Sequence, residues 1–373
     1  MGEPMGLGIS DIVFGEATPE QRQLAWQLNG AAWAPPMSLD VYVARETYLS
    51  RQELSADGRC RYWVLYLKGY PRQIVASCET TRKPVLISEN GVAREGHGYA
   101  IASVYTNPAY RRQGMAAFML RRVQEYMDQD SDYSVLYSNI GGNYYSNLGW
   151  RVFPRKQVTL TVLPHTILGH GNRDKFALKH SQPWRIRYLR LDELPELCDI
   201  DELDLSARFD ALRADGKTHV AFTPSWSQIA WQLARSEFIA GTMFGRTPMN
   251  KGAITENGRS WVYWEHDWRQ TRLNVMRIVH ALDASVQQRV GDIKALLEAA
   301  LAEASAWGLP KVLMWNPDEE TTLGCKAAGN AHPIDVKIVF EERTDTSIPG
   351  LRWAKGKDAR NTVWEDNLYY CWC

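Results

Sequence analysis

The sequence has few cysteines and no excess of charge of either sign. Six cysteines are scattered over 373 residues, which argues against a disulfide framework and fits a reducing compartment. Cys371 and Cys373 form a C-x-C pair, but two ligands cannot complete a zinc site, so we expect no metal. The 43 basic residues balance the 43 acidic residues, which argues against nucleic acid or an anionic membrane surface as a partner.

Long apolar runs are also missing. No window approaches the roughly 20 residues that a membrane-spanning helix needs. The first residues have neither the basic start nor the apolar stretch of a signal peptide, so we expect a cytoplasmic protein without a membrane partner. The hydrophobic content of 45% and the charged content of 23% are ordinary for a globular protein. A length of 373 residues exceeds one ordinary core and predicts two domains.

The predicted elements of the first domain, residues 1–163, follow an α/β (α+β) order. Apolar residues spaced by three or four predict the helices, and alternating or β-rich runs predict the strands. In chain order these are helices at 18–33 and 39–53, strands at 61–68, 73–81, 85–88 and 99–106, a helix at 114–128, a strand at 134–138, a short helix at 143–148 and a last strand at 152–163.

A polar stretch at 164–183, which includes His165, His170 and His180, predicts a linker with solvated histidines. The second domain, residues 184–373, roughly repeats the order of the first, which favours a diverged copy of the same fold. Its expected strands are 184–189, 252–254, 261–266, 274–282, 311–315 and 367–372, and its expected helices are 192–201, 225–243 and 290–307.

The stretch from Val104 to Ala116 carries the clearest chemical signal. A predicted strand ends, Pro108 turns the chain, and a helix begins near Gly114. The first N–H groups of a helix have no partner within it, and the positive end of its dipole lies behind them. That arrangement suits a pyrophosphate. Gly114 and Ala116 keep the side chains small there, and Arg111 and Arg112 add positive charge.

This stretch resembles the Arg/Gln-x-x-Gly-x-Gly/Ala motif of the Gcn5-related N-acetyltransferase (GNAT) superfamily, which Arg111, Gly114 and Ala116 match. The resemblance implies a mixed, mostly antiparallel sheet flanked by helices, and acetyl-CoA as cosubstrate. It implies backbone contacts to the pantetheine arm from Ser103, Val104 and Tyr105. It also implies pyrophosphate contacts from the loop and the start of its helix, namely Arg111, Arg112, Gln113, Gly114, Met115 and Ala116.

A second match lies at Asn143–Trp150, which resembles the family's Phe-Tyr-x-x-Leu-Gly-Phe segment. Tyr145 falls on the tyrosine that in relatives protonates the leaving thiolate, and a phenol with a pKa near 10 can donate a proton at neutral pH. A tyrosine that merely packs in the core is the alternative. Asn139 lies where relatives often place an asparagine that faces the cofactor.

The acceptor amine must lose a proton to attack the thioester, and relatives often use an acidic residue on a central strand. Glu79 is our candidate because it interrupts an otherwise apolar strand. The alternative is an ordinary ion pair with Arg82 or another cation. His97, just before the strand at 99–106, is a second candidate.

The segments Ala76–Thr80 and Ile101–Thr106 and the aromatic tail that ends in Trp372-Cys373 resemble the fungal L-lysine N6-acetyltransferase-like family. That family joins a GNAT domain to a second, diverged GNAT-like domain, and it implies L-lysine as the acceptor. No Arg-x-x-Gly-x-Gly precedes the helix at 290–307, so we expect no CoA there. A protein, polyamine or foreign amine as the acceptor, or a CoA-binding sensor without catalysis, remain as alternatives.

Overall fold

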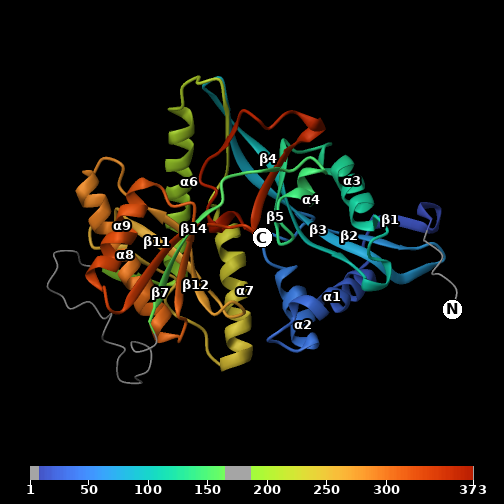
Figure 1. The fold of residues 1–373 in the computed structure, drawn as a ribbon, viewed down its shortest axis with the longest axis horizontal. Coiled ribbons are helices and arrows are strands. Elements are labelled where there is room, and N and C mark those ends of the chain that lie inside the picture. Colours follow the sequence, from blue (N-terminus) through green and yellow to red (C-terminus); the bar gives the residue numbers. More distant parts are fainter. Residues whose placement is uncertain (1–7, 164–185, 373) are drawn as a thin grey trace.

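A computed structural model describes residues 8–163 and 186–372. The chain forms two β-sheets with helices packed against them, and its C-terminal end lies between the sheets (Figure 1). Most strand pairs are antiparallel, and each sheet contains a parallel pair at its centre, so the predicted α/β class with mixed sheets is confirmed. The predicted linker at 164–183, its three histidines and Cys373 fall outside the described residues.

The first half contains predicted helices with clear end signals. Thr18 and Gln21 form a capping box at the start of α1, and α3 buries one apolar face against the sheet. Its elements are η1 (Ile9–Asp11), β1 (Ile12–Glu16), α1 (Pro19–Trp33), α2 (Leu39–Leu49), β2 (Cys60–Leu67), β3 (Tyr70–Glu89), β4 (Val92–Thr106), η2 (Pro108–Tyr110), α3 (Met115–Met127), β5 (Tyr133–Ser138), α4 (Asn143–Ser146), β6 (Arg151–Val152) and β7 (Lys156–Val162).

The second half repeats the order of strands, a long helix, a strand and a further helix. Its elements are β8 (Ile186–Leu189), η3 (Leu191–Glu193), α6 (Leu194–Asp210), β9 (Thr218–Phe222), α7 (Trp226–Phe244), β10 (Gly252–Thr255), β11 (Trp261–Asp267), β12 (Arg272–Val279), α8 (Val286–Ala306), β13 (Lys311–Trp315), α9 (Glu319–Ala331), β14 (Val336–Glu342), β15 (Ile348–Trp353), η4 (Ala354–Gly356), β16 (Thr362–Trp364) and η5 (Tyr369–Cys371).

The two sheets exchange one strand. The first follows the order β1-β2-β3-β4-β5-β15-β6, with β9 and β16 attached beyond β3, and the second follows β8-β10-β11-β12-β13-β7-β14. Thus β15 lies between β5 and β6, and β7 lies at the corresponding place between β13 and β14. The domain bounds 1–163 and 184–373 stay a prediction. They divide the sequence but not the sheets, because each sheet contains one strand from the other side of the linker.

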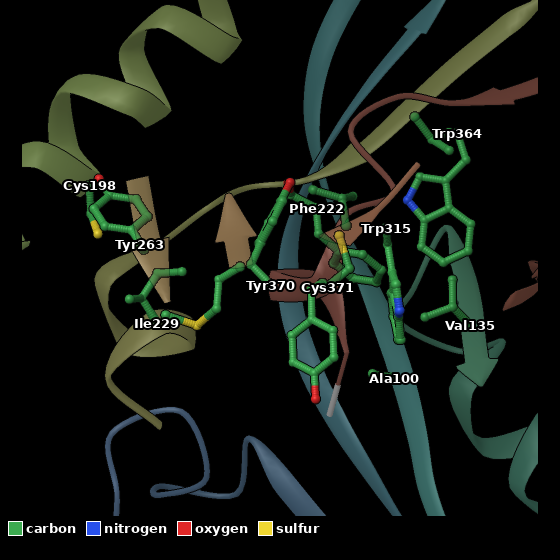
Figure 2. Packing of buried hydrophobic residues seen from close by; sticks show 14 of the residues in the cluster. Ala100, Val135, Cys198, Phe222, Ile229, Tyr263, Trp315, Trp364, Tyr370 and Cys371 are labelled. Carbon is green, nitrogen blue, oxygen red and sulfur yellow. The ribbon is translucent and has the colours of Figure 1, made fainter. Parts of the chain in front are cut away.

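One apolar core joins the two sheets. Ala100 of β4 and Val135 of β5 belong to the same buried cluster as Tyr263 of β11 and Trp315 of β13, and Tyr370 of the tail lies among them (Figure 2). Separate clusters lie between the first sheet and α3 and between the second sheet and α8. The inner face of each sheet is therefore buried against the other half of the chain.

One predicted strand is wrong, and two others are parts of a single strand. Residues 367–372 are not a strand: η5 fills part of this segment, and the Lys83 ammonium donates to the Cys371 carbonyl oxygen at 3.2 Å. Residues 73–81 and 85–88 belong to one long strand, β3. The sequence analysis missed β1, β9, α9, β14, β15 and β16.

None of the helices within 8–163 and 186–372 combines the length and the apolar content needed to cross a bilayer. In the same ranges, no three His, Cys, Asp or Glu side chains come together as a set of metal ligands.

Candidate active site

The strands β4 and β5 run parallel and then separate, which opens a gap in the first sheet. Their ladder ends where Ile101 lies opposite Leu136, although β4 continues to Thr106 and β5 to Ser138. The facing backbone groups beyond that point are outside this ladder, and buried backbone groups need a partner. An extended ligand chain can therefore pair with them in the way a peptide adds to a sheet edge.

A β-bulge in β4 lies beside this gap. The pairing of β3 with β4 joins Ser77 to Tyr105 and Glu79 to Ala102, so β4 has one extra residue. Within the bulge, Ser103 has a φ of 54°. This value lies in the left-handed region, which residues other than glycine seldom adopt. A bulge bends its strand and redirects a side chain. Here the Ser103 hydroxyl donates to Oε1 of Glu79 at 2.6 Å.

The turn after β4 leaves the N-terminus of α3 open to the outside. Gly114 is the N-cap residue, with a φ of 76°, and no side chain in the described part of the chain caps the helix. The first helical bond runs from the Phe118 N–H to the Gly114 carbonyl oxygen, so the earlier N–H groups of the turn have no acceptor within the helix. A Cβ added to Gly114 would meet no atom within 4 Å. An open turn of this kind suits a pyrophosphate, and binding of a pyrophosphate here stays a prediction.

The corresponding helix of the second half begins differently. The N-cap residue of α8 is Ser285, whose hydroxyl accepts from the Gln288 N–H at 3.2 Å. In α8 a side chain of the protein thus accepts from a backbone N–H of the first turn, whereas in α3 no side chain does so among the described residues. This difference favours the first half as the cofactor site, and the absence of CoA from the second stays a prediction.

Three of the predicted cofactor residues on the loop are exposed, namely Arg111, Arg112 and Gln113. Arg111 is held in place, because its Nε donates to the Thr106 carbonyl oxygen at 3.1 Å and its guanidinium lies 5.4 Å from the centre of the Tyr105 ring. It lies at the mouth of the turn, where its charge can reach a phosphate.

The side chains of the other predicted cofactor residues on β4 and α3 are buried or half-buried. The side chains of Val104 and Met115 pack in the cluster under α3, and Tyr105 is buried against Trp33. Ala116 is half-buried in the first turn of the helix. Their peptide groups, rather than their side chains, lie along the gap and the turn.

Asn139 lies at the end of β5, on the gap side of the sheet, and is exposed. Its side-chain oxygen accepts from the Ser347 N–H at 2.9 Å, just before the exchanged strand β15. The side-chain oxygen of Asn139 therefore orders the loop from the second half, and contact of Asn139 with a cofactor stays a prediction.

Tyr145 lies on α4 at the α3 side of the first sheet. Its ring packs edge-on against Tyr144 and Trp150, with ring centres 5.1 and 6.4 Å away. Burial raises the pKa of its phenol, and the nearby Tyr144 and Cys78 raise it further. The phenol is therefore protonated at neutral pH, which is the form that a general acid needs.

Glu79 lies mid-strand in β3, and Arg82 is not its partner, because Arg82 pairs with Asp130 at 3.7 Å. Burial raises the pKa of Glu79 to about 7, with a further rise from Glu46, while the Ser103 hydrogen bond and Arg45 oppose it. A carboxylate with this pKa is partly ionised at neutral pH and can accept a proton.

Glu79 and Tyr145 approach the gap from opposite faces. Cys78, which affects the pKa of Tyr145, is the neighbour of Glu79 on β3, and successive strand residues point to opposite faces. One group can thus take a proton while the other gives one. His97 lies six residues before Ser103 on β4, about 20 Å along the strand, which places it away from the gap.

The second half of the chain supplies residues on the Glu79 side that the sequence analysis missed. A narrow pocket joins Glu79 and Ala102 to Trp231 of α7. One turn further along α7, the guanidinium of Arg235 lies 5.2 Å from the centre of the Trp372 ring. The spacing of apolar residues along α7 does not distinguish a residue that faces the other half of the chain from one that faces its own sheet.

Two protein-family models match the chain, and they divide it between them. The acetyltransferase (GNAT) family matches residues 23–148, and the LYC1 GNAT-like C-terminal domain matches residues 174–373. Among curated proteins, an uncharacterized protein of Saccharomyces cerevisiae is 23% identical over 97% of this chain and 98% of its own length. A protein named lysine acetyltransferase from Yarrowia lipolytica is 22% identical over 95% of this chain and 98% of its own length.

Solved structures agree on the fold. A tandem GNAT protein from the clavulanic acid biosynthesis pathway, 12% identical, has a TM-score of 0.53 and covers 93% of this chain and all of its own. A GCN5-related N-acetyltransferase from Kribbella flavida, 15% identical, has a TM-score of 0.51 and covers 92% of this chain and 71% of its own. With its open turn before α3, its separated central strands and a second half that matches the LYC1 model, the chain belongs to the GNAT acetyltransferase family, with a LYC1 GNAT-like C-terminal domain.

Proposed function

We propose that this protein transfers the acetyl group of acetyl-CoA to the N6-amine of free L-lysine. The observation that carries the proposal is the gap between β4 and β5, which has an uncapped helix N-terminus at one end and the Glu79 carboxylate beside it. The gap accommodates the pantetheine arm and the helix N-terminus holds the pyrophosphate. The thioester then lies between Glu79 and Tyr145.

In the proposed reaction, the amine nitrogen attacks the thioester carbonyl carbon, and Glu79 accepts the proton that the amine loses, directly or through one water molecule. The C–N bond forms as the C–S bond breaks. The departing sulfur takes the phenolic proton of Tyr145. The proton on Glu79 returns to Tyr145 through solvent, and the products are the acetylated amine and the free thiol of CoA.

Lysine as the acceptor is supported by two observations. The Yarrowia relative is named lysine acetyltransferase, and it spans nearly the full length of both chains. In addition, Trp231 of α7 lies on the Glu79 side of the first sheet, and the pocket that it shares with Glu79 is narrow rather than an open groove. A narrow pocket suits a small free amine better than a folded protein.

The test is an assay of thiol release from acetyl-CoA with a panel of amines: L-lysine, a lysine-containing peptide, spermidine and an aryl amine. We expect turnover with lysine to exceed turnover with the other amines by at least about tenfold in kcat/KM. Good turnover of the peptide without turnover of lysine would contradict the proposal. Tight binding of acetyl-CoA without transfer to any amine would instead support a sensor.

A further inference from the structure

A buried charged cluster occupies the face of the second sheet that is turned toward the first. Along β11 and β12, alternate side chains share a face, so Glu265, Asp267 and Asn274 lie on the same side as Tyr263 and in the direction of the core between the sheets. We call the following residues the inner charged cluster: Arg235, Glu265, Asp267, Arg272, Asn274, Arg343 and Tyr369.

Arg343 is the most unusual member of this cluster. It is 5% exposed, and among the residues that the structure describes, neither Nη1 nor Nη2 has a hydrogen-bond partner. Its guanidinium lies 3.8 Å from the centre of the Trp315 ring, and only Nε donates, to the Arg155 carbonyl oxygen. Burial lowers the pKa of Arg343 to about 10, so the group keeps its charge at neutral pH.

Glu265 shows the complementary feature. It is 1% exposed, and its Oε2 lacks a hydrogen-bond partner within the described part of the chain, while Oε1 accepts from the Asn274 amide at 2.6 Å. Burial, with the nearby Asp267, raises the pKa of Glu265 to about 7, although Arg235 opposes the rise. One carboxylate oxygen is thus turned into the interior without a donor.

The inner charged cluster lies next to the gap between β4 and β5. Tyr137 is the first residue of β5 beyond the end of the ladder with β4. Its ring centre is 5.3 Å from that of Trp315, over which Arg343 lies. Tyr369 packs on the same tryptophan with ring centres 4.7 Å apart.

Two members of the cluster connect Arg343 with Glu265. Arg272 affects the pKa of both groups. Tyr369 affects the pKa of Arg343, and the charges of Glu265 and Asp267 in turn raise the pKa of Tyr369. The two unsatisfied groups therefore lie in one electrostatic neighbourhood, between Trp315 and the end of β11.

A buried polar group without a partner is costly, and for a charged group the cost is several kcal/mol. Here an arginine with two free donors and a glutamate with one free acceptor oxygen lie in one cluster without contacting each other. A ligand that carries one carboxylate and one ammonium group would satisfy both. A free amino acid has this pair of charges on one carbon atom, and a polyamine or an internal residue of a protein does not.

We propose that Arg343 and Glu265 hold the head group of a free amino acid acceptor, Arg343 through its carboxylate and Glu265 through its ammonium group. This deepens the proposed function and rests on it for the identity of the amine that is acetylated. The head group then lies on the second sheet, and the side-chain amine reaches past Tyr137 to the thioester and Glu79. The second domain thereby selects the acceptor and the first domain carries the chemistry.

The test measures binding by calorimetry in the presence of CoA with three probes that share a terminal amine. L-Lysine has both head-group charges, 6-aminohexanoate has only the carboxylate, and cadaverine has only the ammonium group. We expect Arg343→Gln to weaken the binding of lysine and of 6-aminohexanoate by at least about tenfold and to leave the affinity for cadaverine unchanged. We expect Glu265→Gln to weaken the binding of lysine and of cadaverine but not the binding of 6-aminohexanoate.

Thermal unfolding of the ligand-free variants separates a binding role from a structural one. Because Arg343 has no anionic partner within residues 8–163 and 186–372, Arg343→Gln should keep or raise the Tm. The matched control is Arg352→Gln, which removes a partly buried arginine that donates to both oxygens of Asp128 at 2.6 and 2.7 Å. The control should lower the Tm and leave the discrimination among the three probes unchanged.

The outcomes for the subsite and for the proposed function are distinct. Equal weakening of lysine and cadaverine by Arg343→Gln, or no binding of lysine and 6-aminohexanoate to the wild type, would overturn the subsite. If lysine is acetylated but its KM is unchanged in Arg343→Gln, the subsite is wrong and the function stands. If lysine binds with this discrimination but is not acetylated, the function is wrong and the subsite stands.

Discussion

Tyr145 and Glu79 lie on opposite faces of the first sheet, and burial raises the pKa of both for different chemical uses. For the phenol, a raised pKa secures the protonated form, which can donate. For the carboxyl group, a pKa of about 7 brings the group into the range where it exchanges protons at neutral pH. The same physical effect thus gives the proposed acid and the proposed base the protonation states that their roles need.

Replacing Tyr145 by Phe tests the acid. The ring still packs against Tyr144 and Trp150, but the departing thiolate loses its proton donor. We expect kcat to fall by about 100-fold or more, while the Kd of acetyl-CoA changes by less than about twofold. Steady-state kinetics and calorimetry check the two quantities. An unchanged kcat would remove Tyr145 as the acid, whereas equal losses in kcat and in binding would indicate a packing role.

Replacing Glu79 by Gln tests the base through the dependence on pH. Glu79 accepts a proton only when ionised, so kcat/KM of the wild type should rise with pH through about 7. Glu79→Gln should lower kcat/KM and abolish that rise. The matched control is Glu89→Gln, which removes an exposed carboxylate that pairs with Lys357 and should keep the profile. A rise near pH 7 that survives in Glu79→Gln would assign the titration to another group.

The raised pKa of Glu79 also affects stability. The folded protein holds this proton more tightly than the unfolded chain, in which the pKa is near 4.5. The contribution of Glu79 to the free energy of unfolding is therefore fully present below about pH 4.5, and it is lost as the pH rises through about 7. Activity and stability thus respond to this group in opposite directions.

Single residues differ in how far the sequence could predict them. Gly114 and Tyr145 stand in local motifs, so their neighbours in the chain identify them. Arg343 is one of 43 basic residues, and its distinguishing property is the absence of a partner in a buried place among residues described by the structure. That property arises from Trp315 and Tyr137, both distant in the chain, and no local pattern expresses it.

At the scale of elements, the open N-terminus of α3 makes its own prediction. Gly114→Glu places a carboxylate where we expect the pyrophosphate to bind, and the variant should lose measurable binding of acetyl-CoA by calorimetry. Gly114→Ala is the matched control, because it carries the same backbone strain at a φ of 76°, about 1 kcal/mol, without the charge. The Gly114→Ala variant should bind acetyl-CoA with a modest loss of affinity. Normal activity of the Glu variant would refute the pyrophosphate site.

Elements with strong local signals were predicted, and elements that depend on distant partners were not. The capping box of α1 and the apolar face of α3 are visible in the sequence. In contrast, β9, β15 and β16 are short, and each is fixed by pairing with strands more than a hundred residues away. The aromatic run at 367–372 looked like a strand because its residue types favour strands, but it packs across the core between the sheets as η5.

For the whole molecule, the exchange of β7 and β15 has a consequence for folding. Each sheet lacks an internal strand until the other half supplies it. A gap at that position would expose two strand edges and part of the apolar core. The core between the sheets draws on β4, β5, β11, β13 and the tail alike. The two halves should therefore unfold together, in one calorimetric transition.

Fragments cut at the linker test this directly. The piece 1–163 lacks β15, so β5 and β6 lose their shared partner, and β7 has no sheet to join. We expect 1–163 and 164–373 each to aggregate or remain partly unfolded when expressed alone, and to form a soluble one-to-one complex when expressed together. Size-exclusion chromatography and far-UV circular dichroism report both results. As a control, joining residues 343–356 to the end of 1–163 through a flexible linker should improve solubility, and a scrambled segment should not. A fragment 1–163 that is monomeric and melts cooperatively by itself would mean that the exchanged strand adds little, and that the first half folds on its own.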